Sequence, residues 1–270
     1  MKKQLISNRL NPNAGIMSWY VRELRKLSRD MTDECRETIK GIYAKGYEGI
    51  SFDESLSSQV RIALNQLMQK YGDKFSDKAK NLAESLVRRT NRYSNGQINQ
   101  ALKDMLGAKA ANFAISGSVV SAEKKEIFKA LVFENVSLIR SIPNEYFKQI
   151  TGAVARSIEN GDGVRWLASE LKKFGHSTER RVQLIAQDQT RKAYNSINLR
   201  NFQEAGIRKF KWLHSGGSAQ PREYHKNVLN GNIYDMDNPP VIDPKTQKTG
   251  FPGELPYCRC VMCAVLSFEE

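Results

Sequence analysis

Apolar residues recur every three or four positions between Tyr20 and Gly206, and this periodicity strongly limits the possible folds. Side chains at that spacing lie on one face of an α-helix. The first run predicts a long helix whose buried face is the stripe Leu24, Leu27, Met31, Cys35, Ile39 and Tyr43. The chain is therefore expected to be built mainly from amphipathic helices.

Glycine and proline divide the rest of this pattern, because glycine often follows the last turn of a helix and proline fits the first turn. We place stops at Gly72, Gly107, Gly175 and Gly206, and a helix start at Pro143. The predicted helices after the first cover residues 56–71, 76–90, 98–106, 127–132, 143–160, 164–174 and 178–205.

Beyond Gly206 the apolar period changes to two. Phe210 and Trp212 alternate with lysines, which is typical of a half-buried strand over residues 207–214. The remaining predictions are a turn at 216–218, a short helix over 221–229, a short strand over 232–235, an ordered loop over 238–256 and a strand over 257–266.

The predicted fold is mainly α, an elongated helical body with a small C-terminal α+β module. We divide it into a basic helical N-terminal region (1–140), a second helical segment (141–206) and the α+β module (207–270). No apolar run approaches the roughly 18 residues that a membrane span needs, so no membrane anchor is expected. The first residues are also too polar for a signal peptide.

Positive charge is concentrated in the helical part of the chain. The whole chain has 42 Lys and Arg against 29 Asp and Glu, a formal net charge of +13. Residues 1–140 carry a net +9 and residues 165–211 a net +7, whereas residues 212–270 carry a net −2. Such a surplus favours an anionic partner, of which nucleic acid is the obvious candidate. The alternatives are a solvated surface or a face that docks an acidic protein. The candidate DNA- or partner-binding residues are Arg88, Arg89, Arg92, Arg180, Arg181, Arg191, Lys192 and Arg200.

Three of the four cysteines lie close together near the C-terminus. Cys258, Cys260 and Cys263, with His225 or His214, have the donor types of a structural zinc site. On a regular strand Cys263 would face away from the other two, so a bulge would be needed to bring them together. The alternative is that these cysteines are small buried hydrophobic residues and no cofactor is bound. The chain shows no nucleophile elbow, no paired metalloprotease histidines and no phosphate-binding loop, so we expect no catalytic residues.

The C-terminal half resembles the phage head morphogenesis proteins, the Mu F-like minor head (minor capsid) family. The resemblance covers roughly residues 135–266. It rests on the ordered pieces Ser141-Ile142-Pro143-Asn144-Glu145-Tyr146-Phe147, Ile185-Ala186-Gln187-Asp188-Gln189-Thr190-Arg191-Lys192, Lys211-Trp212-Leu213-His214, Arg222-Glu223-Tyr224-His225, Gly231, Pro239-Pro240, Pro252-Gly253 and Cys258-Arg259-Cys260. Two departures stand out. Leu255-Pro256-Tyr257 replaces the His-Pro-Asn of many members, and Cys263 lies outside the family pattern.

The resemblance implies a virion component of a tailed bacteriophage, in the head interior or at the portal vertex, and in the host cytoplasm during assembly. Its implied partners are the portal protein and packaged double-stranded DNA, with scaffold or major capsid protein as further candidates, and it implies that the protein can leave with the genome. Two alternatives stay open: a metal-dependent nuclease using His225 and the cysteine cluster, and an assembly organiser that binds proteins and no DNA.

Overall fold

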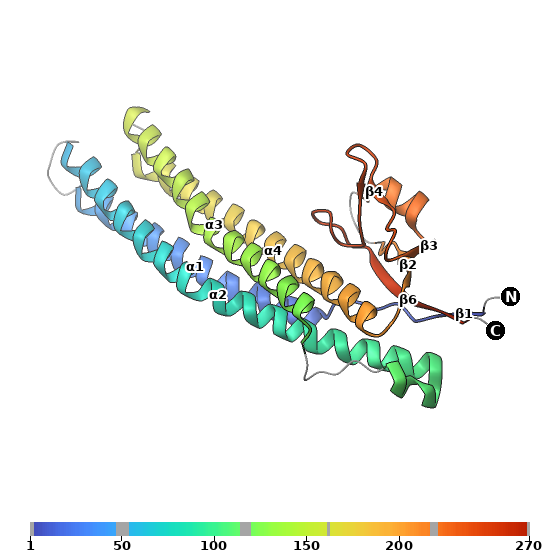
Figure 1. The fold of residues 1–270 in the computed structure, drawn as a ribbon. Helices are drawn as coiled ribbons and strands as arrows, with labels where there is room; N and C mark the ends of the chain where they lie inside the picture. Colours follow the sequence, from blue (N-terminus) through green and yellow to red (C-terminus); the bar gives the residue numbers. More distant parts are fainter. Residues whose placement is uncertain (1–2, 47–53, 114–119, 161–162, 217–220, 269–270) are drawn as a thin grey trace. The chain divides into compact units, whose positions relative to one another are not determined.

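The computed structural model describes residues 3–46, 54–113, 120–160, 163–216 and 221–268 (Figure 1). These residues fold into two compact units, each built from separated segments. We call the first the helical unit, Ser18–Ala83 with Val132–Ala186, and the second the sheet unit, Met1–Met17 with Glu84–Leu131 and Gln187–Glu270. The predicted consecutive regions 1–140, 141–206 and 207–270 divide the chain in a different way.

Four long helices make up most of the chain. They are α1 (Ala14–Gly46), α2 (Glu54–Leu106), α3 (Ala122–Asn160) and α4 (Gly163–Glu204), and a 3-10 helix, η1 (Gly107–Phe113), follows α2. The mainly α fold class is therefore confirmed. Within the part of the chain that the structure describes, no helix is long and apolar enough to cross a membrane.

Several predicted helix breaks are wrong. Gly72 lies inside α2, Pro143 inside α3 and Gly175 inside α4, and the gap predicted at 91–97 is also helical, inside α2. In each case the buried face continues across the position, for example from Tyr71 to Phe75. The packing of that face outweighs the intrinsic cost of glycine in a helix, which is about 1 kcal/mol. Tertiary burial therefore decides where these helices end.

The helical unit has a core formed by the predicted stripes. Residues of α1 such as Leu24, Met31 and Cys35 are fully buried. Polar side chains in this core are paired, since the Tyr20 hydroxyl donates to Asn135 Oδ1 at 2.9 Å. The other large residues of this core come from α2, α3 and α4 and include Tyr71, Phe75, Tyr146, Phe147, Leu167 and Leu171.

The sheet unit contains a four-stranded antiparallel sheet. Its order is β1-β6-β2-β3, from Lys3–Ile6, Val261–Phe268, Lys209–Leu213 and Ile233–Asp235. A smaller ladder pairs β4 (Val241–Asp243) with β5 (Lys248–Thr249), and a π-helical turn, η2 (His225–Leu229), precedes β3. The core of this unit joins the sheet to helical residues and includes Ile98, Leu102, Tyr194, Phe202, Phe210, Trp212, Leu229 and Met262.

The strand predictions are confirmed in part. β2 shows the predicted alternation, with Phe210 and Trp212 buried between half-buried neighbours. The strand expected from residue 257 begins only at Val261, and the expected loop 238–256 contains β4 and β5. Within the predicted 221–229 helix, residues 225–229 form η2. Most of the turn predicted at 216–218 lies outside the described residues.

Candidate functional site

His225 is held in a fixed orientation inside the sheet unit. The π turn of η2 is closed by Asn230 N, which donates to the His225 carbonyl at 3.1 Å. The imidazole is 2% exposed, and its Nε2 lies 2.9 Å from the Ile242 carbonyl of β4. A carbonyl only accepts, so Nε2 carries a proton and donates it to this carbonyl. The Trp212 ring packs edge-on against this imidazole at 5.2 Å between centroids.

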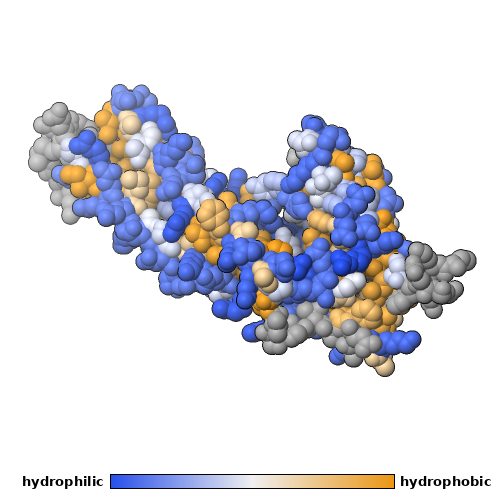
Figure 2. Space-filling model, viewed as in Figure 1, coloured by the Kyte–Doolittle hydropathy of each residue, from blue (hydrophilic) through white to orange (hydrophobic). Residues whose placement is uncertain are grey.

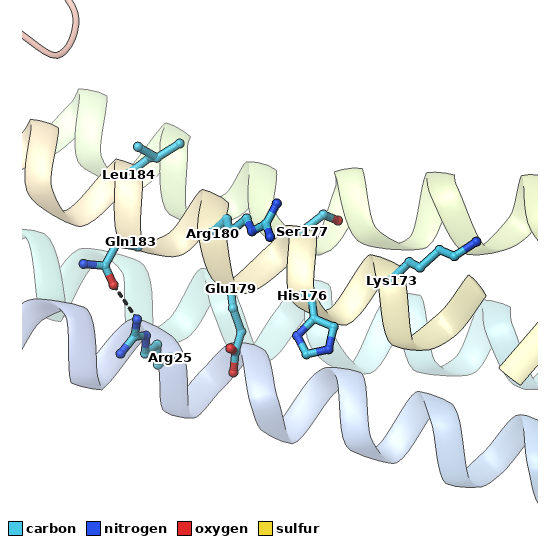
Figure 3. A pocket seen from close by; sticks show the side chains of 8 residues that line it. All are labelled: Arg25, Lys173, His176, Ser177, Glu179, Arg180, Gln183 and Leu184. Carbon is cyan, nitrogen blue, oxygen red and sulfur yellow. Dashed lines mark hydrogen bonds between the residues drawn. The ribbon is translucent and has the colours of Figure 1, made fainter. Parts of the chain in front are cut away.

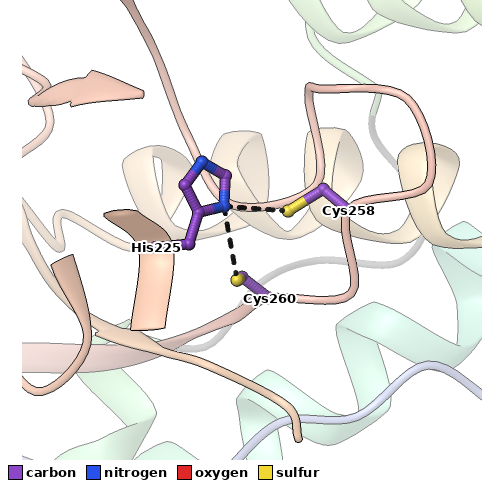
Figure 4. A group of neighbouring side chains, drawn as sticks. All are labelled: His225, Cys258 and Cys260. Carbon is purple, nitrogen blue, oxygen red and sulfur yellow. Dashed lines mark hydrogen bonds between the residues drawn. The ribbon is translucent and has the colours of Figure 1, made fainter. Parts of the chain in front are cut away.

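Cys258 and Cys260 face the other ring nitrogen, Nδ1 (Figure 4). Their Sγ atoms lie 3.5 and 3.7 Å from His225 Nδ1. The ligand atoms of the three residues lie within 4.8 Å of one another, and all three residues are buried. We call this group the Cys-His cluster.

The sequence placed Cys258 and Cys260 on a strand, but they lie in a turn. Both precede β6, in a turn where Cys258 N donates to the Leu255 carbonyl at 3.0 Å. Tyr257 has a φ of 59°, a left-handed conformation that reverses the chain direction locally. Cys263 lies on β6 opposite Lys211, outside the Cys-His cluster, and the prediction that placed it with the other two needs this correction.

His214 lies beside the cluster, just after β2. Its backbone N–H donates to Asn230 Oδ1 at 2.8 Å. Its Nδ1 is 3.6 Å from Cys260 Sγ. Unlike the three cluster residues, the His214 side chain is partly exposed.

The two thiols are electrostatically coupled. The pKa of Cys258 is lowered because Cys260 donates to its sulfur, with His225 and the backbone N–H groups of Cys260 and Gly253 adding to the effect. The pKa of Cys260 is raised in turn, because it lies beside the Cys258 sulfur and is desolvated. The site therefore favours at least one thiolate at neutral pH.

Other residues of the family pattern support the same cluster. Arg222 Nη2 donates to the Pro256 carbonyl at 2.9 Å, next to the turn that carries Cys258. Gly231 has a φ of 87°, and its N–H donates to the Trp212 carbonyl at 2.8 Å. The Pro240 carbonyl, which follows Pro239, accepts from Gly250 N at 3.0 Å and closes the β4–β5 ladder. Arg259 separates the two cysteines and is partly buried.

Sequence reasoning missed two supporting residues of α4. Asp188 Oδ1 accepts from Tyr257 N at 2.6 Å, and Asn195 Nδ2 donates to the Cys260 carbonyl at 3.3 Å. Gly253, at a φ of 86°, packs so close to Asn195 that a Cβ there would come within 2.2 Å of its amide nitrogen. Nothing in the local sequence marks these contacts, although Asp188 and Gly253 lie in the quoted family pieces.

The predicted basic residues differ in how available their charges are. Arg88, Arg89, Arg92, Arg180 and Arg181 are exposed, whereas Arg191, Lys192 and Arg200 are partly buried.

Two of the partly buried residues have charged neighbours. Arg200 forms ion pairs with Glu123 at 3.0 Å and with Glu204 at 3.8 Å. Burial lowers the pKa of Arg191, and the neighbouring positive charge of Arg259 adds to that effect.

A groove in the helical unit joins Arg180, which the sequence singled out, to cationic residues that it did not. It has a volume of about 790 Å³ and lies between α1 and α4, with Arg25, Lys173 and Arg180 along it (Figure 3). An adjoining hollow of about 700 Å³ shares His176 and Glu179 and is lined by further cations. We call both hollows together the basic groove, and its cations are Arg25, Arg29, Arg36, Lys40, Lys172, Lys173 and Arg180.

Acidic residues only partly compensate this charge. Asp33 and Glu179 line the groove, where Glu179 pairs with Arg29 at 2.6 Å and Asp33 with Arg36 at 3.0 Å. Two acidic residues beside it also pair with groove cations, Glu37 with Lys40 at 3.7 Å and Glu170 with Lys173 at 2.6 Å, so seven cations face four carboxylates. Hydrophilic residues cover much of the visible molecular surface (Figure 2). The groove therefore keeps a positive surplus that suits an extended anion.

Comparison with known proteins identifies the region that holds the cluster. Residues 148–263 match the family model described as Phage Mu protein F like protein. The chain therefore carries a Mu F-like region, and the predicted resemblance to the phage head morphogenesis family is confirmed. All residues of the Cys-His cluster and its supporting family residues fall within the matched range.

One curated relative matches over most of the chain. It is an uncharacterized protein of Haemophilus influenzae, 28% identical over 261 residues. The match covers 93% of this chain and 54% of the relative, so the chain spans about half the relative's length. No solved structure matches.

Proposed function

We propose that this protein is a structural minor component of a tailed-phage head, which associates with the portal and binds packaged DNA without sequence preference. The observation that carries the proposal is the Mu F-like match over residues 148–263. The family residues inside that range converge on a closed, buried cluster, which suits a rigid adhesive module better than an active site.

The basic groove supports the DNA part of the proposal. Lys and Arg side chains along two helices can neutralise successive phosphates without reading bases. The exposed arginines 88, 89 and 92 of α2 offer a second set of phosphate contacts on the sheet unit. Binding of this kind is electrostatic, so its affinity falls steeply as salt rises.

Fluorescence anisotropy with duplexes of unrelated sequence tests this part. We expect equal affinity for each duplex and a straight line of log affinity against log salt, with a slope of about −0.9 per phosphate contacted. The triple variant Arg25→Ala, Lys173→Ala, Arg180→Ala should make that slope shallower by about 2 to 3.

A matched control removes the same charge elsewhere. Lys226, Lys245 and Lys248 lie on the sheet unit, and the triple alanine variant of these residues also lowers the net charge by three. It should leave the slope nearly unchanged. An equal loss in both variants would show that net charge, and not the groove, governs binding. Affinity independent of salt would contradict the DNA proposal.

Particle composition tests the structural part. Quantitative mass spectrometry of purified procapsids and mature particles should find a few to a few tens of copies per particle. Co-purification with the portal protein is expected, and it should survive nuclease treatment if the contact is direct. Absence from both kinds of particle would contradict the proposal.

The burial of the Cys-His cluster argues against the nuclease alternative. Cys258 and Cys260 are 4% and 2% exposed, so a phosphodiester could not reach a metal held between them without rearrangement. The protein-only organiser predicts portal binding with no DNA affinity at low salt, and the anisotropy experiment separates it from the proposed function.

A further inference from the structure

We propose that the Cys-His cluster is a structural zinc site, in which Cys258, Cys260 and His225 bind one Zn²⁺ and His214 completes the fourth position. The site lies wholly within the sheet unit, and its proposed role is independent of the proposed function. The ligand atoms would be the Nδ1 atoms of both histidines and the Sγ atoms of both cysteines.

The distances agree with tetrahedral coordination. Zinc bonds of about 2.3 Å to sulfur and about 2.05 Å to nitrogen at the tetrahedral angle place sulfur and nitrogen ligands about 3.6 Å apart. Three of the four sulfur–nitrogen separations are 3.5 Å for Cys258–His225, 3.7 Å for Cys260–His225 and 3.6 Å for Cys260–His214. A metal ion would therefore fit with little movement of the Cys258, Cys260 and His225 side chains, whereas His214, which lies outside this group of three, would have to move closer.

Two sulfurs approach His225 Nδ1 from different directions (Figure 4). One cation placed between them would interact with the nitrogen lone pair and with both thiolates at once. Two thiolates and one Zn²⁺ also sum to zero charge, which burial requires.

The surroundings resemble the outer shell of a metal site. Metal-binding histidines usually donate their other ring N–H to a carbonyl or carboxylate, and His225 Nε2 faces the Ile242 carbonyl. The Trp212 ring packs edge-on against the His225 imidazole, at 5.2 Å between centroids, and so helps to fix the orientation of this proposed ligand.

The donor set identifies the metal and its role. Two thiolates and two imidazoles are one of the standard donor sets of tetrahedral structural zinc sites. The site would join three separate pieces of the sheet unit: η2, the end of β2 and the turn before β6. Binding replaces the protons of both thiols with Zn²⁺, so two protons leave for each ion bound to the fully protonated site.

The test uses the full-length chain purified without a polyhistidine tag. Inductively coupled plasma mass spectrometry should find about one zinc per chain after dialysis. Replacement by Co²⁺ should give the visible absorption of tetrahedral cobalt together with a near-ultraviolet thiolate charge-transfer band. Cys258→Ser and Cys260→Ser should each lower metal affinity at least about a hundredfold.

Two kinds of variant sharpen the test. Cys263→Ser is the matched control, since it removes a buried cysteine of the same segment outside the cluster, and it should keep the metal and the spectrum. His214→Ala should retain cobalt with weaker affinity and an altered visible spectrum, because water replaces one ligand. An unchanged spectrum in His214→Ala would overturn His214 as the fourth ligand.

The wild-type chain itself provides the decisive negative result. If it holds no zinc and develops no cobalt bands while circular dichroism shows a folded protein, the site is a pair of buried thiols and the proposal fails. It also fails if Cys263→Ser loses metal as completely as Cys258→Ser.

Discussion

The cores of the two compact units differ in the contacts that stabilise them. The helical unit has a core of apolar stripes whose members lie three or four residues apart. The sheet unit adds a buried polar network between distant segments, in which Asn201 Nδ2 donates to Ser94 Oγ at 2.6 Å across 107 residues, where the helical unit has the Tyr20–Asn135 pair. Local periodicity therefore outlines the helical core, and long-range polar contacts contribute to both cores.

The largest expected effect tests the sheet unit. Trp212 is fully buried between β2 and η2, and Trp212→Ala should lower the free energy of unfolding by about 3–5 kcal/mol through lost contacts and a cavity. Hydrogen exchange should show lost protection in β2, β3 and β6, with the helical unit little changed. Equal loss of protection in both units would contradict the division, because the chain would then unfold as one cooperative body.

A slightly smaller effect is expected for the complementary variant. Met31 is fully buried on α1, and Met31→Ala should cost about 2–5 kcal/mol. Here exchange should accelerate in residues 18–83 and 132–186 while the sheet keeps its protection. Chemical denaturation followed by tryptophan fluorescence gives the matching free energies.

One substitution in α2 should stabilise the helical unit, in contrast to the two destabilising variants. Gly72 lies inside α2 and a Cβ there would meet no atom within 4 Å, so Gly72→Ala should raise stability by about 0.5–1 kcal/mol through helix propensity. Thermal unfolding of wild type and variant measures the gain.

Gly253→Ala is the opposite case in the sheet unit. Its Cβ would clash with Asn195 at a positive φ, so the substitution should lower the stability of the sheet unit.

The smallest expected effect depends on pH. Hydrogen bonds from Lys70 and Tyr71 lower the pKa of Glu34 below its usual 4.5. Its contribution is therefore fully present above that value and is lost as pH falls through the lowered pKa. Glu34→Gln should cost less than about 1 kcal/mol at pH 7, because the side chain is 38% exposed.

The measurement for Glu34 is the melting temperature between pH 7 and pH 2. The difference between wild type and Glu34→Gln should shrink toward the acid end. The exposed Glu145 of α3 offers a matched control, and Glu145→Gln should track wild type more closely across the series. A difference that grows as pH falls would contradict the sign of this prediction.

Much of the fold could be predicted because its causes are local. The stripe from Leu24 to Tyr43 and the alternation of Phe210 and Trp212 depend on neighbours in the sequence, and both predictions are confirmed. The helix breaks at Gly72, Pro143 and Gly175 were wrong because buried faces on both sides of each position keep the helix intact. β1 was not predicted, since four residues carry no clear period and its partner β6 lies more than 250 residues away.

In the candidate site, too, the residue types could be predicted from the local sequence, whereas the long-range contacts could not. The donor types of His225, Cys258 and Cys260 were visible in the sequence, and the structure brings these three together. The exclusion of Cys263 depends on where β6 begins, which pairing with β2 decides. The supporting roles of Asp188 and Asn195 depend on how α4 meets the turn before β6, and no local pattern reports that contact.

The pairing of β1 with β6 also has a consequence during protein synthesis. Residues 3–6 must wait for residues 261–268 to leave the ribosome before their ladder can form. At about 5–20 residues per second, that delay is roughly 13–50 s. All segments of the helical unit emerge earlier, so its core can form cotranslationally while the first strand is still without its neighbour. A nascent chain stalled before residue 261 should therefore carry a folded helical unit and an unpaired β1, which pulse proteolysis of ribosome-bound chains can detect.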